Sequence, residues 1–186
     1  MATRVLQRTT TLVDGFKTYE GGLRFTHQVG ARIQGTGSVS YTVVKADLPG
    51  IPENKGLGYA FDMTFRATGR MQFHGSFARS AGVSNRTQAT YSINKTYGGD
   101  VTYQLGPRLV LNGGARYSVK DYAQSSLAGI PGLAHEDSTR YYGTARFDLS
   151  PRFSLAVDGF HNQRRANLSA FTYSDNRVSL SLFTHL

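Results

Sequence analysis

Two short motifs contain the residue types that hydrolytic enzymes use. In His74-Gly75-Ser76 the histidine and the serine are two positions apart, so in an extended strand both side chains lie on one face. A histidine in that position can activate a serine hydroxyl for acyl transfer. In His135-Glu136-Asp137 a histidine adjoins two carboxylates, which is a combination used for general acid–base chemistry. The three remaining histidines are isolated in the sequence: His27, His161 and His185.

Composition excludes several other kinds of site. The chain has 186 residues and no cysteine, which excludes disulfides, thiolate zinc sites and iron–sulfur clusters. No pair of histidines has supported metal-ligand spacing, and phosphate-binding glycine motifs are absent, so we expect no cofactor. The formal net charge is +9, but the basic residues are spread along the whole chain rather than clustered. That distribution is not typical of a nucleic-acid-binding protein, and we expect no nucleic-acid partner.

The elements that position these residues have a period of two. From Gly21 to Val29 and from Tyr97 to Leu105, apolar and polar residues alternate strictly. Alternation of this kind predicts β-strands with one apolar and one polar face, and it excludes helices for these segments.

Four similar segments divide the alternating runs. They start 38, 38 and 44 residues apart, and their middle positions hold glycine, serine and proline, which favour tight turns. We interpret them as hairpin turns: Val29-Gly30-Ala31-Arg32-Ile33, Ala67-Thr68-Gly69-Arg70-Met71, Leu105-Gly106-Pro107-Arg108-Leu109 and Leu149-Ser150-Pro151-Arg152-Phe153.

The opposite ends of the strands are joined by longer and more polar segments, expected at about 44–57, 80–88, 121–138 and 162–175. Two further alternating runs, Arg4 to Val13 before an Asp14-Gly15 turn and Arg177 to Leu186, bring the count to ten antiparallel strands, within a range of eight to twelve. Short turns at one end and long loops at the other are typical of an up-and-down transmembrane β-barrel. We expect residues 1–186 to form one such domain, with both termini at the short-turn end.

A soluble β-protein is the alternative, and three features favour the membrane. The polar face is mostly threonine, serine, glutamine, asparagine and glycine rather than lysine and glutamate. The expected strands are long enough to cross a bilayer. Aromatic residues gather near both strand ends, which predicts two interfacial girdles: Tyr19, Tyr41, Tyr59, Tyr97, Tyr117, Tyr141 and Tyr142 toward the loops, and Phe65, Tyr103, Phe147 and Phe153 near the turns.

The proline-containing turns at 105–109 and 149–153, each followed by an alternating strand, resemble the periplasmic hairpins of bacterial outer-membrane β-barrels, including porin-like families. The run from Val178 to Leu186 resembles in part the end strand that the outer-membrane assembly machinery reads, although it closes on leucine rather than on an aromatic residue. The resemblance implies a bacterial outer-membrane location, contact with outer-membrane lipids and lipopolysaccharide, and insertion by that machinery. The residues after Met1 do not show the pattern of a signal peptide, and we expect none in this sequence.

Two sets of charges are the candidate functional residues. Six are expected to face the lumen, where opposite charges would either pair and fill it or form a constriction that filters small ions: Arg24, Asp62, Arg66, Asp100, Arg146 and Asp148. Four turn arginines are expected to form a basic rim near lipid headgroups: Arg32, Arg70, Arg108 and Arg152.

The sequence therefore predicts a non-enzymatic outer-membrane barrel. A ten-stranded barrel is narrow, which favours a narrow channel for transport, or a structural barrel whose long loops meet a protein partner. One alternative is a barrel enzyme. The His74-x-Ser76 spacing is similar to that of lipid A deacylase barrels, although Phe77 stands where those enzymes carry asparagine, and the motif at His135 would suit a protease-like barrel. Another alternative is a segment or subunit of a larger porin or export barrel.

Overall fold

The ten expected strands are present and form one antiparallel sheet. The structure is a computed structural model that describes residues 5–13, 16–46, 53–83, 89–124 and 133–184. Each strand pairs with the next one along the chain, so the sheet order is β1 to β10 without a crossover. The strands are β1 (Val5–Val13), β2 (Phe16–Val29), β3 (Ile33–Ala46), β4 (Asn54–Arg66), β5 (Met71–Val83), β6 (Ala89–Leu105), β7 (Leu109–Gln124), β8 (His135–Ser150), β9 (Phe153–Ala166) and β10 (Tyr173–Thr184). A short 3-10 helix, η1 (Ser169–Phe171), precedes β10.

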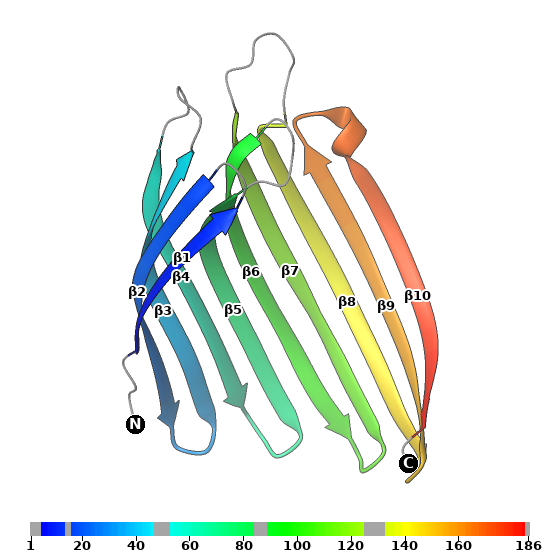
Figure 1. The fold of residues 1–186 in the computed structure, drawn as a ribbon. Coiled ribbons are helices and arrows are strands. Elements are labelled where there is room, and N and C mark those ends of the chain that lie inside the picture. Colours follow the sequence, from blue (N-terminus) through cyan, green and yellow to red (C-terminus); the bar gives the residue numbers. More distant parts are fainter. Residues whose placement is uncertain (1–4, 14–15, 47–52, 84–88, 125–132, 185–186) are drawn as a thin grey trace.

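The sheet curves into an arch that remains open. Among the described residues β1 pairs only with β2 and β10 only with β9, so the two edge strands face each other across a gap (Figure 1). The short turns lie together at the end of the sheet where β1 begins and β10 ends (Figure 1), as the sequence predicts. No helix in the described part of the chain is long and apolar enough to cross a membrane.

The four predicted hairpin turns are confirmed. Gly30 and Gly106 occupy these turns with positive φ angles of 59° and 78°, a conformation that costs residues with a Cβ atom about 1–2 kcal/mol. In the other two turns a hydroxyl oxygen accepts backbone N–H groups. Thr68 Oγ1 accepts from Arg70, and Ser150 Oγ accepts from Arg152 and Phe153. Local turn chemistry therefore fixes each hairpin.

The pairing register separates the two faces of the sheet. Leu23 pairs with Val39, Val39 with Tyr59, Phe77 with Tyr97 and Tyr117 with Thr139, so odd-numbered residues of β2 to β9 share one face. We call this the outer face and the opposite one the inner wall. Nearly all the large hydrophobic side chains that are exposed lie on the outer face, and three on β10 are exposed most: Val178, Leu180 and Leu182, at 80%, 68% and 61%.

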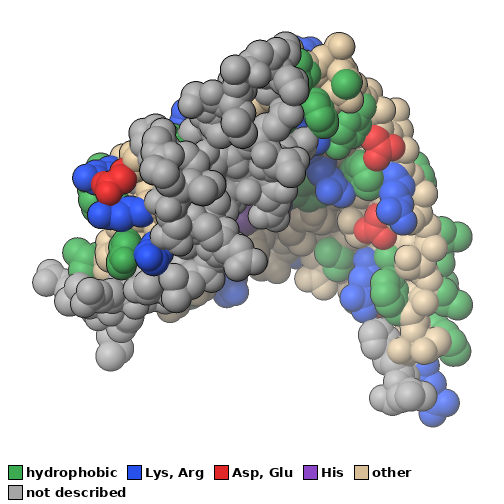
Figure 2. Space-filling model, turned by 45° about the horizontal axis from the view of Figure 1, so that its top comes forward, with side chains coloured by type: hydrophobic (Ala, Val, Ile, Leu, Met, Phe, Trp, Pro, Cys, Tyr) green, Lys and Arg blue, Asp and Glu red, His purple; other side chains and the backbone are tan. Residues whose placement is uncertain are grey.

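Few apolar side chains are buried, because most of them lie on the exposed outer face. The buried apolar side chains of the described residues are Val44, Leu133 and Ala156, far fewer than a soluble domain of this length needs. In the space-filling view the molecule is an arch hollowed on one side, and its right arm carries hydrophobic side chains outward and charged ones toward the hollow (Figure 2). A sheet with an apolar outer face and a polar inner wall is the arrangement of a transmembrane barrel.

The outer face has two zones along each strand. On β6, Tyr97 to Leu105 carries apolar residues outward, and nine residues suffice to cross the hydrocarbon layer at a typical tilt. Toward the loops the same face becomes charged at Lys95, Asp121 and Arg165. The tyrosines at positions 59, 97, 117 and 141 lie near this boundary on the outer face, where the sequence predicts a girdle.

Two sequence-based expectations about the strand ends are wrong. The strands extend further toward the loops than expected. β7 runs to Gln124 and β8 begins at His135, so the His135-Glu136-Asp137 motif lies in a strand rather than in a loop. Tyr142, expected in the girdle, lies on the inner wall because its neighbour Tyr141 occupies the outer position. The expected Asp14-Gly15 turn lies outside the described residues.

Candidate functional site

The inner wall contains a hydrogen-bonded network centred on His74. The register places His74 of β5 opposite Asp100 of β6 and next to Asp62 of β4. His74 Nδ1 lies 2.9 Å from Asp100 Oδ1, and Nε2 lies 2.7 Å from Asp62 Oδ2. Both contacts are hydrogen bonds only when the ring carries both protons, because ionised carboxylates only accept. The three side chains therefore form a bridge across three strands in which the His74 ring lies between two carboxyl groups.

The network continues onto β7 and β8. Asn112 Nδ2 donates to Asp100 Oδ2 at 3.1 Å and to Thr102 Oγ1 at 2.9 Å. Tyr142 Oη donates to Asp100 Oδ1 at 3.3 Å. Gly114 leaves the space for this contact, since a Cβ atom there would lie 2.7 Å from Tyr142 Oη and 2.5 Å from the carbonyl oxygen of Gly99. Asp100 of β6 thus contacts side chains from three other strands, β5, β7 and β8.

The contacts of His74 determine whether it can activate Ser76 in the His74-Gly75-Ser76 motif. Ser76 shares the inner wall with His74, as the spacing predicts. However, both ring nitrogens of His74 already contact carboxylates. The ring has no nitrogen left to take a proton from Ser76, so the pair lacks the geometry of a nucleophile and its base.

The His135-Glu136-Asp137 motif is divided between the two faces of β8. His135 Nδ1 contacts Asp121 Oδ1 at 2.7 Å on the outer side. Glu136 points to the inner wall, where it pairs with Arg164 and lies 3.8 Å from the Lys120 ammonium. Because adjacent strand residues face opposite ways, the histidine and Glu136 do not form one site.

The predicted lumenal charges lie on the inner wall, and among the described residues the ion pairs give a single arginine–aspartate link between them, Arg146–Asp148. Asp62 and Asp100 bond to His74 rather than to an arginine. Arg24 and Asp62 both line a hollow of about 250 Å³ on β2 to β6. Arg146 pairs with Asp148 of its own strand at 3.4 Å. Arg66, near the turns, lies opposite Gln72.

Beyond these residues, the inner wall of β7 to β9 carries a basic group that the sequence alone does not reveal. Arg116 of β7 lies directly opposite Arg140 of β8. The Arg140 guanidinium carbon lies 4.1 Å from the centroid of the Phe160 ring. Arg164, one strand further and nearer the loops, pairs with Glu136. Alternation alone would place all three arginines on the polar face, but only the register brings Arg116 and Arg140 together.

The predicted turn rim consists of four arginines in the hairpin turns. All four side chains, Arg32, Arg70, Arg108 and Arg152, are exposed. The backbone carbonyls of three of them tie neighbouring hairpins together. Arg32 accepts from the N–H of Arg66, Arg70 from Gln104 and Arg108 from Asp148, each at 2.8 Å.

At the loop end, surface ion pairs join neighbouring strands. Glu53 contacts Lys45 at 2.9 Å and Lys55 at 3.0 Å, which links the ends of β3 and β4. Hydrogen bonds from these two ammonium groups lower the pKa of Glu53 below its ordinary value. The three side chains are well exposed, so this link is a modest one.

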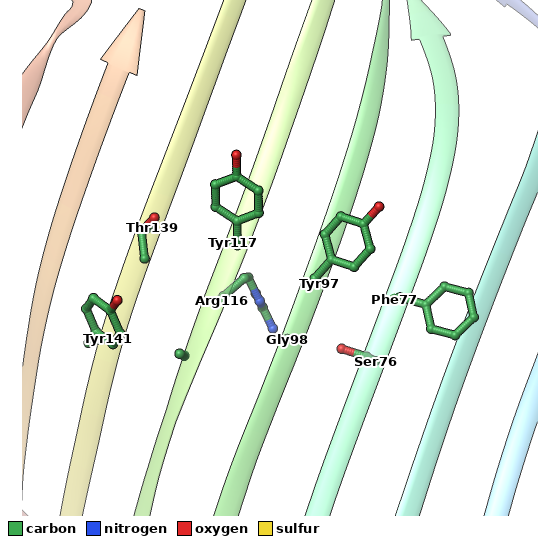
Figure 3. Close-up of a pocket in the computed structure, with 9 residues that line it drawn as sticks. Ser76, Phe77, Tyr97, Gly98, Arg116, Tyr117, Thr139 and Tyr141 are labelled. Carbon is green, nitrogen blue, oxygen red and sulfur yellow. The ribbon is translucent and has the colours of Figure 1, made fainter.

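A shallow groove of about 600 Å³ lies among aromatic side chains of the outer face and is also lined by Ser76, Gly98 and Arg116 of the inner wall. Figure 3 shows Tyr97, Tyr117 and Tyr141 along three successive strands, with Phe77 beside them. The Tyr97 and Tyr117 rings are stacked with centroids 6.5 Å apart. A row of tyrosines at one height is what an interfacial girdle requires.

No group of three or more potential metal ligands occurs among the described residues.

Comparisons with known proteins agree with this architecture. Residues 13–185 match the model of the family described as "Putative beta-barrel porin 2". Two similar solved structures are OmpT with loop L8 deleted, an outer membrane protein of Vibrio cholerae, and Pseudomonas aeruginosa OccK2 (OpdF) in complex with glucuronate. For OmpT the TM-score is 0.58 at 11% identity, over 95% of this chain and 61% of that one. For OccK2 the TM-score is 0.57 at 13% identity, over 98% of this chain and 55% of that one. None of the curated proteins matches the chain.

Proposed function

We propose that the ten strands form part of the wall of a water-filled channel in the outer membrane. The premise is that the chain belongs to the family described as "Putative beta-barrel porin 2". The observation that carries the proposal is the two-faced sheet with unpaired edges. Its outer face is apolar over a membrane-spanning width, its inner wall is polar and charged, and its first and last strands have a free edge among the described residues.

The free edges argue for a barrel of more than ten strands. In hydrocarbon every backbone N–H and C=O must be bonded, so β1 and β10 must pair with further strands, which in the refolded protein come from other copies of the chain. The sequence-based expectation of a narrow ten-stranded barrel would require these two strands to meet. Instead, the arch superposes on 61% and 55% of two larger barrels. If ten strands make up 61% or 55% of a barrel, the whole barrel has about 16 or about 18 strands. Barrels of that size enclose an aqueous channel.

The polar lining favours the passage of small hydrophilic solutes without a chemical reaction on them. The His74 network and the arginines of β7 to β9 present fixed charges of both signs to the hollow. OccK2, which resembles this chain in fold alone, was solved with glucuronate, a small anionic sugar acid. The basic stretch of this inner wall suits solutes of that charge.

The membrane contacts that we propose follow from the same layout. The four turn arginines suit anionic phospholipid headgroups on the periplasmic side, and the basic residues beyond the tyrosine girdle suit lipopolysaccharide. Insertion by the outer-membrane assembly machinery follows from the barrel class. The longer connections at the opposite end remain candidates for meeting a protein partner.

Liposome swelling tests the channel. Proteoliposomes with the refolded protein are diluted into isotonic solutions of arabinose, glucose or raffinose, beside protein-free liposomes. An open wide lumen predicts swelling that is fastest for arabinose and slowest for raffinose. Swelling no faster than in protein-free liposomes for every sugar would contradict the proposal.

A further inference from the structure

We infer that the inner wall of β2 to β6 carries a binding site for a small uncharged polyol, of the size of a monosaccharide. The site is the hollow of about 250 Å³ that Arg24 and Asp62 both line. Pockets for drug-sized ligands begin at about 300 Å³, so this hollow suits a smaller molecule. The inference deepens the proposed function by naming a solute class, and it rests on that function only in that an open lumen gives a solute access to the hollow.

The polar groups of the hollow come from five adjacent strands and share the inner wall. Besides the two charged residues, four hydroxyl side chains line it: Thr36, Ser38, Ser76 and Thr96. Thr36, Asp62 and Ser76 are successive cross-strand partners on β3, β4 and β5. Two residues nearer the loops, Arg24 of β2 pairs with Ser38. The register of the strands therefore assembles these groups around one hollow.

Small side chains keep the centre of the hollow open. Ala60 of β4 and Ala78 of β5 are direct cross-strand partners and both line it. Gly98 of β6 lies opposite Ser76, and a Cβ atom there would lie 3.1 Å from the Ser76 hydroxyl oxygen. Alanine and glycine at these positions therefore leave the surrounding hydroxyls accessible. Three residues at outer-face positions complete the lining: Gly37, Phe61 and Phe77.

The donors and acceptors of the hollow are available to a ligand. In the described part of the chain the four hydroxyls form no side-chain hydrogen bond, and no ion pair includes Arg24. Asp62 Oδ2 lies 2.7 Å from His74 Nε2, which leaves Oδ1 to accept from a ligand. On β7 and β8, by contrast, the hydroxyl oxygens of Ser118 and Ser138 lie 2.8 Å apart and bond to each other. The hydroxyls of the hollow therefore face water or a solute rather than one another.

This set of groups matches a molecule whose own hydroxyls both donate and accept. Arg24 only donates and an ionised Asp62 only accepts, so a ligand must offer acceptors to one and donors to the other. An anion would be repelled by the carboxylate and a cation by the guanidinium. A zwitterion such as glycine would meet both charges, but it has too few polar groups to bond the four hydroxyls as well. Weak binding in an open hollow suits a solute that must also leave a channel.

The test is an NMR titration of the full refolded chain, carrying ¹³C-labelled alanine methyl groups, in a detergent without a sugar headgroup. Arabinose is the probe, and acetate and glycine at the same concentrations are the charged comparators. We expect arabinose to shift the Ala60 and Ala78 methyl signals saturably, because both residues line the hollow. The signal of Ala145, on the outer face, should not move. The three signals are assigned by their loss in A60G, A78G and A145G.

Two variants of the hollow have matched controls on β8. Ser38→Ala should raise the Kd for arabinose about threefold and Arg24→Gln about tenfold, as expected for loss of a neutral and of a charge-assisted hydrogen bond. Ser138→Ala and Arg140→Gln make the same changes on the inner wall away from the hollow. Each of these two should leave the Kd within about 1.5-fold of the original value.

Three results would overturn the site: no saturable shift with arabinose, tighter binding of glycine or acetate at the same methyl groups, or equal effects of Ser38→Ala and Ser138→Ala. Conductance in planar bilayers separates the two proposals. Arabinose binding without conductance refutes the channel and keeps the site, whereas conductance without an arabinose shift refutes the site and keeps the channel.

Discussion

His74 joins two carboxylates that would otherwise repel each other on the inner wall. Its ring nitrogens lie 2.9 Å and 2.7 Å from Asp100 and Asp62. We predict that His74→Ala lowers the free energy of unfolding by about 2 kcal/mol, because both carboxylates lose a charged donor. Urea unfolding of the protein refolded in lipid vesicles measures this change.

Two further variants distinguish the bridge from a general effect of losing a histidine. His27→Ala, on the outer face, should change the unfolding free energy by less than about 0.5 kcal/mol. Adding Asp62→Asn to His74→Ala should recover part of the loss, since it removes one of the two facing charges. If the double variant were less stable than His74→Ala alone, the bridge would not be the source of stability.

Gly114 and Gly113 are adjacent glycines with different surroundings. A Cβ atom at Gly114 would lie 2.5 Å from a backbone oxygen and 2.7 Å from Tyr142 Oη, whereas at Gly113 the nearest atom is 3.7 Å away. We predict that Gly114→Ala lowers the unfolding free energy by about 1–3 kcal/mol, as overpacking does. Gly113→Ala should be neutral or stabilising. Equal unfolding midpoints for the two variants in urea would contradict the close packing at Gly114.

Residue-level contacts are the part least predictable from the sequence. Alternation places His74, Asp62 and Asp100 on the polar face, and alignment on the turns puts both aspartates at one height. The alignment does not show that His74 lies between them, because that depends on the β5–β6 register set through a long connection. The Arg116–Arg140 pair is not predictable from the sequence for the same reason.

At the scale of single strands, β10 offers a direct test of which face meets lipid. Leu180 is 68% exposed on the outer face, and Ser181 points to the inner wall. We predict that Leu180→Arg lowers the unfolding free energy in bilayers by about 2–4 kcal/mol, the cost of a cation near the bilayer centre. Ser181→Arg should cost less than about 1 kcal/mol. Similar small losses for both variants would contradict a lipid-facing outer wall.

The hairpin turns allow a second test with matched glycines. Gly30 has a φ of 59°, while Gly69 lies in an equivalent turn without a positive φ, and at both positions a Cβ atom would meet no other atom within 4 Å. We predict that Gly30→Ala lowers the unfolding free energy by about 1–2 kcal/mol, because alanine is strained in the left-handed region. Gly69→Ala should change it by less than about 0.5 kcal/mol in the same urea titration. Equal losses would show that backbone conformation is not what distinguishes the turns.

Strands and turns are predictable because each has a local signal. Alternation identifies ten strands, and Gly30, Gly106, Pro107 and Pro151 mark the turns. The strand ends toward the loops are not predictable, because alternation of apolar and polar residues fades beyond the tyrosine girdle. There the outer face carries Lys95 and Asp121, and the sequence favours a loop at His135 where the structure has a strand. Beyond the hydrocarbon both faces of a strand meet water, and neither needs to be apolar.

On the scale of the whole molecule, we propose that the ten strands form an arc of a wide barrel rather than a closed small barrel. Composition and alternation predict a barrel but contain no signal for its circumference, which depends on strand tilt and register. The proposal is supported by the open arch and by its coverage of 61% and 55% of two longer chains of similar fold.

The most direct test is the distance between the edge strands. The chain has no cysteine, so Thr9→Cys in β1 and Ser179→Cys in β10 can carry a single pair of spin labels for pulsed electron resonance in lipid bilayers, with the labelled chain diluted in excess unlabelled chain so that only distances within one chain are measured. Adjacent strands lie about 4.8 Å apart, so a closed ten-stranded barrel requires a label separation below about 15 Å. An arc of a barrel of about 16–18 strands predicts a separation above about 25 Å. A dominant short distance would contradict the wide channel, and a dominant long distance would support it.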